Sequence, residues 1–132
     1  MIKGIDHIGI AVTNLNKSIS KWEKLSGEKA GKREKIDAQG VLLSKLKLKE
    51  GPVIELLEPT DTETPVGKFL KKKGEGIHHF CFQVENLDHI VEHLKKSGVR
   101  FVQDVPGKGA DGSRIIFIHP SDFNGVLIEL KE

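Results

Sequence analysis

The stretch Gly4-Ile5-Asp6-His7-Ile8-Gly9-Ile10-Ala11-Val12-Thr13-Asn14-Leu15 returns later in the chain as Gly76-Ile77-His78-His79-Phe80-Cys81-Phe82-Gln83-Val84-Glu85-Asn86-Leu87. Six of the twelve positions are identical in the two copies. The similarity extends further, since Val53-Ile54-Glu55-Leu56 matches Leu127-Ile128-Glu129-Leu130. A repeat of this kind predicts two similar modules, each of roughly 60 residues, fused head to tail.

Both copies indicate the same order of strand and helix. Ile5 to Val12 alternates as a strand does, and Asn14 then caps a helix whose apolar residues recur at helical spacing until Gly27. A short helix from Thr64-Pro65 to Gly74 joins the copies. Further strands are expected at 39–49 and 53–57 in the first copy, and at 80–84, 100–104, 113–119 and 125–130 in the second.

These elements predict an α+β fold in a single domain, residues 1–132. Module one covers about residues 1–60, the linker helix about 64–74, and module two about 75–132. The function therefore has to be sought in what the two modules share.

The composition excludes several classes of protein. With 21 Lys and Arg against 19 Asp and Glu, the formal charge is +2, too small for a dedicated nucleic-acid-binding domain. The longest apolar runs are four residues, far below the ~20 needed to cross a bilayer. Met1 leads directly into a strand-like segment rather than a signal peptide, and Cys81 is the single cysteine. We therefore expect a cytoplasmic protein with no disulfide and no membrane or nucleic-acid partner.

Four polar residues recur at equivalent places in the two copies. His7, Glu55, His79 and Glu129 all lie on the strand face opposite the large apolar residues that pack on the helices. For one residue alone, a structural histidine or a solvent-facing glutamate is the ordinary interpretation. Recurrence of both types favours a metal site instead, because a pseudo-twofold relation between modules would bring two imidazoles and two carboxylates together. That donor set suits a borderline or hard divalent cation, with two positions left for water or substrate.

The remaining polar features have simpler explanations. The other histidines are expected to be structural or exposed: His78, His89, His93 and His119. Cys81, on the same face as His79, is interpreted as a small core residue or as part of a pocket wall. The run Lys71-Lys72-Lys73 is interpreted as a solvated last helical turn favoured by the helix dipole.

Several segments, taken in order, carry a family resemblance over essentially the whole chain. Paired modules with one His and one Glu each resemble the vicinal oxygen chelate superfamily. Within this superfamily, six segments of the chain resemble the methylmalonyl-CoA epimerase family: Asp6–Val12, Glu55–Pro59, Gly74–His79, Gly107–Gly112, His119-Pro120 and Gly125–Leu130.

The resemblance implies a cup-shaped, eight-stranded mixed sheet made of two tandem βαβββ modules around a metal site. It implies metal ligands at His7, Glu55, His79 and Glu129, in agreement with the repeat. One divalent metal per chain is implied, cobalt first, with nickel, manganese, zinc or magnesium as alternatives. An acyl-CoA thioester substrate and a homodimer are implied as well.

The implied reaction interconverts (2R)- and (2S)-methylmalonyl-CoA by α-proton abstraction through an enolate. A chelated metal stabilises an enolate as a Lewis acid, and Glu129 is our candidate for the base. Some family members use a glutamate on the strand after the first helix as the second proton donor. Alignment through Gln39-Gly40-Val41 puts Leu43 at that position, so the second donor stays open between metal-bound water and a different side chain.

Other functions stay open at the level of sequence. Glyoxalase I (lactoylglutathione lyase), acting on the hemithioacetal of methylglyoxal and glutathione, has the same fold and donor set and also moves a proton. An extradiol-type dioxygenase would need only two histidines and one carboxylate. A drug-sequestering member of the superfamily would need no metal. The order and spacing of the segments favour the epimerase.

Overall fold

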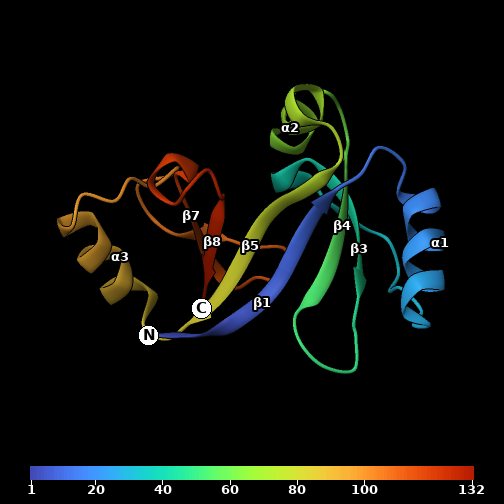
Figure 1. Cartoon of the computed structure of the whole chain (residues 1–132). Coiled ribbons are helices and arrows are strands. Elements are labelled where there is room, and N and C mark those ends of the chain that lie inside the picture. The colour runs from blue at the N-terminus through green and yellow to red at the C-terminus, as the bar shows by residue number, and fades with distance from the viewer. The chain divides into compact units, whose positions relative to one another are not determined.

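Eight strands and three α-helices follow one another in the computed structural model, which describes residues 1–132 (Figure 1). In chain order they are β1 (Ile2–Ala11), α1 (Leu15–Ser26), β2 (Glu34–Ile36), β3 (Val41–Leu46), β4 (Val53–Pro59), α2 (Pro65–Lys73), β5 (Gly76–Val84), α3 (Leu87–Lys96), β6 (Gly107–Lys108), β7 (Arg114–Ile118) and β8 (Ile128–Lys131). The strand order in the sheet is β2-β3-β4-β1-β5-β8-β7-β6, with parallel and antiparallel pairs. The expected α+β class with an eight-stranded mixed sheet is confirmed. No helix combines the length and the apolar content needed to span a bilayer.

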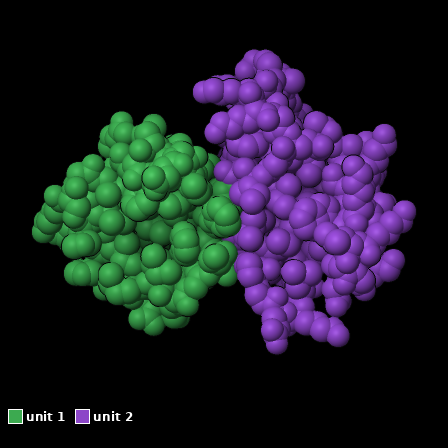
Figure 2. Space-filling view, viewed as in Figure 1, with its two compact units in different colours: residues 1–6, 79–132 green, residues 7–78 purple.

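Two compact units divide the chain (Figure 2). Unit 1 contains residues 1–6 and 79–132, and unit 2 contains residues 7–78. Both β1 and β5 contribute residues to each unit, so the units differ at their ends from the predicted modules. The expected module boundaries near residues 60 and 75 stay a prediction.

In unit 2, helix α1 covers one face of β3 and β4 (Figure 1). The Asn14 side chain accepts the N–H of Lys17 at the start of the helix, and Gly27, with φ at 75°, ends it in the left-handed conformation that favours glycine. Both helix boundaries agree with the sequence. The contact buries an apolar cluster of Val12, Leu15, Ile19, Leu46, Ile54 and Leu56.

Helix α2 covers part of the opposite face of unit 2. Thr64 caps it by accepting the N–H of Gly67, and the three expected lysines form its last turn. Beneath it lies a second apolar cluster of Ala11, Val41, Leu43, Leu57 and Val66. Further along the same strands, this face carries the polar side chains of the candidate site.

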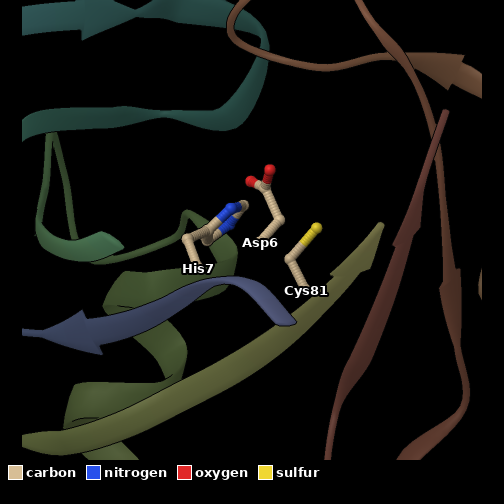
Figure 3. A group of neighbouring side chains, drawn as sticks. All are labelled: Asp6, His7 and Cys81. Carbon is tan, nitrogen blue, oxygen red and sulfur yellow. The ribbon is translucent and has the colours of Figure 1, made fainter. Parts of the chain in front are cut away.

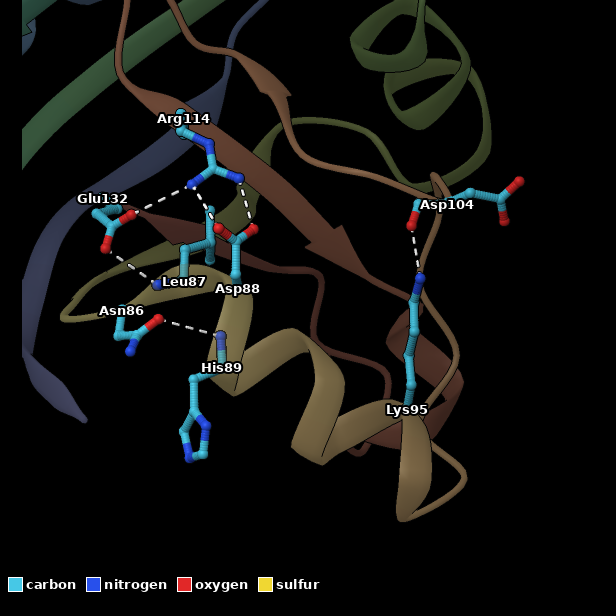
Figure 4. Close-up of polar contacts among 8 residues, drawn as sticks. All are labelled: Asn86, Leu87, Asp88, His89, Lys95, Asp104, Arg114 and Glu132. Atoms are coloured by element: carbon cyan, nitrogen blue, oxygen red, sulfur yellow. Dashed lines mark hydrogen bonds and ion pairs between the residues drawn. The ribbon is translucent and has the colours of Figure 1, made fainter.

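In unit 1, polar contacts fix the start of α3 to the neighbouring strands (Figure 4). The Glu132 carboxylate accepts the N–H of Leu87, the first residue of the helix. Arg114 of β7 pairs with Asp88 at 2.6 Å and with Glu132 at 3.4 Å. The apolar side of α3 then contributes to a buried cluster of Val84, Leu87, Ile90, Val91, Ile116, Ile118 and Leu130.

The strand prediction for residues 100–104 was wrong. Only an isolated bridge between Phe101 and Ile118 forms there. The Asp122 carboxylate accepts the N–H of Arg100 and pairs with its guanidinium, so this N–H does not join a strand ladder. The short strands β2 and β6 at the two edges of the sheet were missed, because two or three residues are too few to show an alternating pattern.

Replacing Leu56 tests the cluster beneath α1. Its side chain is fully buried, so Leu56→Ala should leave a cavity and lower the free energy of unfolding by about 2–5 kcal/mol. Leu25→Ala is the matched control, because Leu25 is 77% exposed and its truncation should change that free energy by less than about 0.5 kcal/mol. Urea unfolding followed by circular dichroism measures both, and equal effects would contradict this packing.

Candidate metal centre

The first candidate pair lies in unit 2, on the parallel strands β1 and β4. Gly9 of β1 is opposite Glu55 of β4, and His7 lies two residues earlier on the same face. His7 Nδ1 is 3.5 Å from Glu55 Oε2, and the two residues are 6% and 9% exposed. Ile54 and Leu56 point to the opposite face, into the cluster beneath α1. The alternation of β4 therefore places Glu55 beside His7, as the sequence predicts.

The second candidate pair lies in unit 1, on the parallel strands β5 and β8. Cys81 of β5 is opposite Glu129 of β8, and His79 lies two residues earlier. His79 Nε2 is 3.3 Å from Glu129 Oε1, and the two residues are 6% and 5% exposed. The His79 ring also packs edge-to-face on Phe117 of β7, with 5.9 Å between ring centroids, which restricts the orientation of the imidazole.

The two pairs are equivalent in the repeat. In each unit the same parallel register brings one imidazole and one carboxylate into contact on a buried surface. Burying a carboxylate costs free energy unless hydrogen bonds or a cation compensate it. Imidazole nitrogen and carboxylate oxygen are also the donors that a borderline divalent cation takes from proteins. The donor set of each unit therefore fits a metal ion.

Cys81 is a fully buried thiol on the site face of β5. Figure 3 draws it with Asp6 and His7 of β1, and the Cys81 thiol and the Asp6 carboxylate point to the same side of their strands. Burial raises the pKa of the Cys81 thiol far above its usual range, and the negative charges of Glu129 and Asp6 add to the shift. The thiol therefore stays protonated, which suits a small buried residue rather than a nucleophile.

Leu43 and Lys45 lie on the same face of β3 as the unit 2 pair. Lys45 is directly opposite Glu55 in the register of β3 and β4, whereas Leu43 is fully buried in the apolar cluster beneath α2. Lys45 was missed at the level of sequence. In unit 1 the residue opposite Glu129 is Phe117. A comparison of the two copies for positions where they differ would have pointed to Lys45.

Two further histidines make structural contacts. Nδ1 of His119 accepts the N–H of Ser121 at 3.3 Å and lies 2.8 Å from its hydroxyl, which confirms the expected structural hydrogen bond. The His78 ring packs edge-on against Phe69 of α2, with 5.1 Å between centroids. The last two, as expected, are exposed on α3: His89 and His93.

The chain is similar to known proteins over nearly its whole length. Residues 6–117 match the family model of the Glyoxalase/Bleomycin resistance protein/Dioxygenase superfamily. The chain is 36% identical to a mitochondrial methylmalonyl-CoA epimerase of Dictyostelium discoideum, over 97% of this chain and 77% of that protein. It is 34% identical to an ethylmalonyl-CoA/methylmalonyl-CoA epimerase of Cereibacter sphaeroides, over 100% of this chain and 99% of that protein.

Solved structures agree with these relatives. A methylmalonyl-CoA epimerase in complex with methylmalonyl-CoA and NH4+ superimposes with a TM-score of 0.92 and 38% sequence identity. The match covers 99% of this chain and 94% of that one. Since both the sequence and the structural matches span nearly the full length, this chain belongs to the methylmalonyl-CoA epimerase family of the glyoxalase/bleomycin resistance/dioxygenase superfamily.

Proposed function

We propose that this chain interconverts the (2R) and (2S) forms of methylmalonyl-CoA. The observation that carries the proposal is the buried contact between a histidine and a glutamate in each unit. The chain that holds these contacts is similar over nearly its full length to methylmalonyl-CoA epimerases. The α-carbon of this substrate lies between a thioester and a carboxylate. Inversion requires a group that removes the α-proton and a group that returns a proton to the opposite face.

We assign one divalent metal per chain to His7, Glu55, His79 and Glu129 together. The chemistry of the donors, the matching geometry of the two pairs and the family membership support this assignment. Bound by these residues, a divalent cation would supply Lewis-acid stabilisation of the enolate oxygens. Imidazole and carboxylate donors can bind cobalt, nickel, manganese, zinc or magnesium. The family resemblance makes cobalt our first choice.

Glu129 is the residue to which we assign proton abstraction. The carboxylate of Glu129 is buried, and β8 holds it on the same face as His79. A substrate bound at this pair would therefore lie beside the Glu129 carboxylate. Leu43, at the position where some relatives have a glutamate, offers no proton. The return of the proton therefore falls to water or to a different side chain of the site.

Two further expectations stay predictions. The homodimer is inferred from the family resemblance, and light scattering on the purified chain tests it. The cytoplasmic location is inferred from the single cysteine, which is a free buried thiol here, whereas the Dictyostelium relative is named as mitochondrial. Fractionation of the source cells tests the location.

The substrate assay is the first test of the proposed function. The purified chain should convert (2S)- to (2R)-methylmalonyl-CoA in an assay coupled to an enzyme specific for the (2R) form. Chelation of the metal should lower kcat/KM at least about tenfold, and Co2+ should restore it, because the enolate would lose its Lewis acid. Activity only on methylglyoxal with glutathione would contradict the proposal and favour glyoxalase I.

Metal analysis distinguishes one shared ion from two separate ones. If all four residues hold a single ion, His7→Gln and His79→Gln should each abolish the one equivalent of tightly bound metal, since each removes an imidazole donor. His93→Gln is the matched control, because His93 is exposed on α3 and should leave the equivalent in place. Inductively coupled plasma mass spectrometry after dialysis measures the content. A single variant that keeps one full equivalent would contradict the shared site.

Exchange of the α-proton in deuterated water tests Glu129 as the base. At saturating metal, Glu129→Gln should slow the exchange about 10²- to 10⁴-fold, the usual contribution of a positioned acid or base. Glu55→Gln is the matched variant, because it alters a metal donor of unit 2 and should recover most of the exchange rate once metal saturates it. Nuclear magnetic resonance of the methylmalonyl group follows both. Normal exchange by metal-loaded Glu129→Gln would rule out this assignment.

A further inference from the structure

Lys131, at the end of β8, has its ammonium between two carboxylates of unit 1. Its Nζ lies 2.8 Å from Asp111 Oδ2 and 3.2 Å from Asp6 Oδ2, and the lysine side chain is only 18% exposed. The three residues come from the last strand, from the connection between β6 and β7, and from the first strand. One side chain therefore ties together three segments that are far apart in the sequence.

The repeated framework does not need a charge at this position. Lys131 follows Glu129 by two residues, as Leu57 follows Glu55, and the ladders pair Ile115 with Lys131 and Leu43 with Leu57. Leu57 is 3% exposed in an apolar cluster. Since a leucine fills the equivalent place, the lysine serves a purpose other than packing. Ordering a long charged side chain at low exposure costs free energy, which its two ion pairs offset.

Asp111 shows what the lysine holds. Its Oδ1 accepts both the N–H and the hydroxyl of Ser113, which shapes the turn, while its Oδ2 accepts from Lys131, which fixes the turn to β8. The turn belongs to the glycine-rich loop, residues 109–113, which joins β6 to β7 and contains Gly109 and Gly112. Backbone hydrogen bonds hold the two ends of the loop to each other, since the N–H of Gly109 donates to the carbonyl of Ser113 at 2.8 Å. Glycine leaves such a loop a wide choice of conformations, so the additional contact with Lys131 restricts where the loop lies against β8.

The anchor lies next to the unit 1 pair. Glu129 and Lys131 are two residues apart on β8, so their side chains share a face and their Cα atoms are about 7 Å apart. The ion pair with Asp111 therefore brings the glycine-rich loop to the face of β8 that carries Glu129. An acyl-CoA bound at His79 and Glu129 would have this loop as a neighbour.

We propose that Lys131 is a positioning residue that anchors the glycine-rich loop against the acyl-CoA substrate beside Glu129. The inference rests on the proposed epimerase function, and it adds a residue with no part in the chemical step. Without the anchor, the loop has to be ordered when substrate binds, which weakens binding and leaves the proton transfer at the same geometry. Removal of the anchor should therefore raise KM and leave kcat nearly unchanged.

Steady-state kinetics with methylmalonyl-CoA test this split. Lys131→Met and Asp111→Asn should each raise KM about three- to tenfold and change kcat less than about twofold. Asn keeps an oxygen for Ser113 and loses the charge that pairs with Lys131. The double variant should be no worse than Lys131→Met alone, because both changes remove the same contact. Lys131→Arg keeps the positive charge that both carboxylates contact, so its KM should stay within about twofold of the original value.

Lys96→Met is the matched control for net charge. Lys96 forms an exposed ion pair with Glu92 on α3, so its replacement removes one positive charge from the chain without touching the loop. Its KM should equal that of the unchanged protein. If Lys96→Met and Lys131→Met raised KM equally, the effect would come from the net positive charge of the protein, which attracts the anionic CoA ester. That result would overturn the proposal.

Hydrogen exchange measures the anchor without any reaction. In the absence of substrate, backbone amides of residues 109–113 should exchange faster in Lys131→Met and Asp111→Asn than in the unchanged protein, and as slowly in Lys131→Arg as in the unchanged protein. Unchanged exchange, or a loss of kcat equal to the rise in KM, would overturn the proposal. If the unchanged protein did not act on methylmalonyl-CoA, the proposed function would fall, while the exchange result would still decide whether Lys131 anchors the loop.

Discussion

Parallel pairing of β1 with β4 and of β5 with β8 sets each histidine two residues before the residue that faces a glutamate. Because side chains alternate along a strand, a slip of one residue would turn Glu55 or Glu129 toward the face that packs on the helices. The carboxylate would then lie among buried isoleucine and leucine side chains, where it is strongly disfavoured. The hydrophobic alternation that builds the cores therefore also fixes the contacts of the candidate site.

The two faces of these strands serve different ends. The clusters beneath α1 and α3 bury most of the large aliphatic side chains and stabilise the units. The opposite face carries imidazoles and carboxylates that are less than a tenth exposed, a costly arrangement that the apolar clusters make affordable. In unit 2, α2 covers part of that face with a cluster that includes Leu43, so the polar part of the face is limited to the stretch around His7 and Glu55.

The copies agree in their donors and differ in the residues around them. Lys45 is opposite Glu55, whereas Phe117 is opposite Glu129, and Leu57 in one copy corresponds to Lys131 in the other. A substrate with a thioester on one side of the reacting carbon and a carboxylate on the other is itself unsymmetrical. Two identical halves would treat those groups alike. Substitutions that break the repeat on the site face are therefore a sensible place to look for substrate recognition.

Sequence alone determined the repeat, the helix caps at Asn14 and Thr64, and the face on which each His and Glu lies, because these depend on periodicity and neighbouring residues. Only the tertiary structure decided that residues 100–104 form no ladder, since that outcome depends on a carboxylate more than twenty positions away, at Asp122. It alone decided the ion pairs of Lys131 as well. Residues 6, 111 and 131 meet through the pairing of distant strands, and no local pattern in the chain encodes such a meeting.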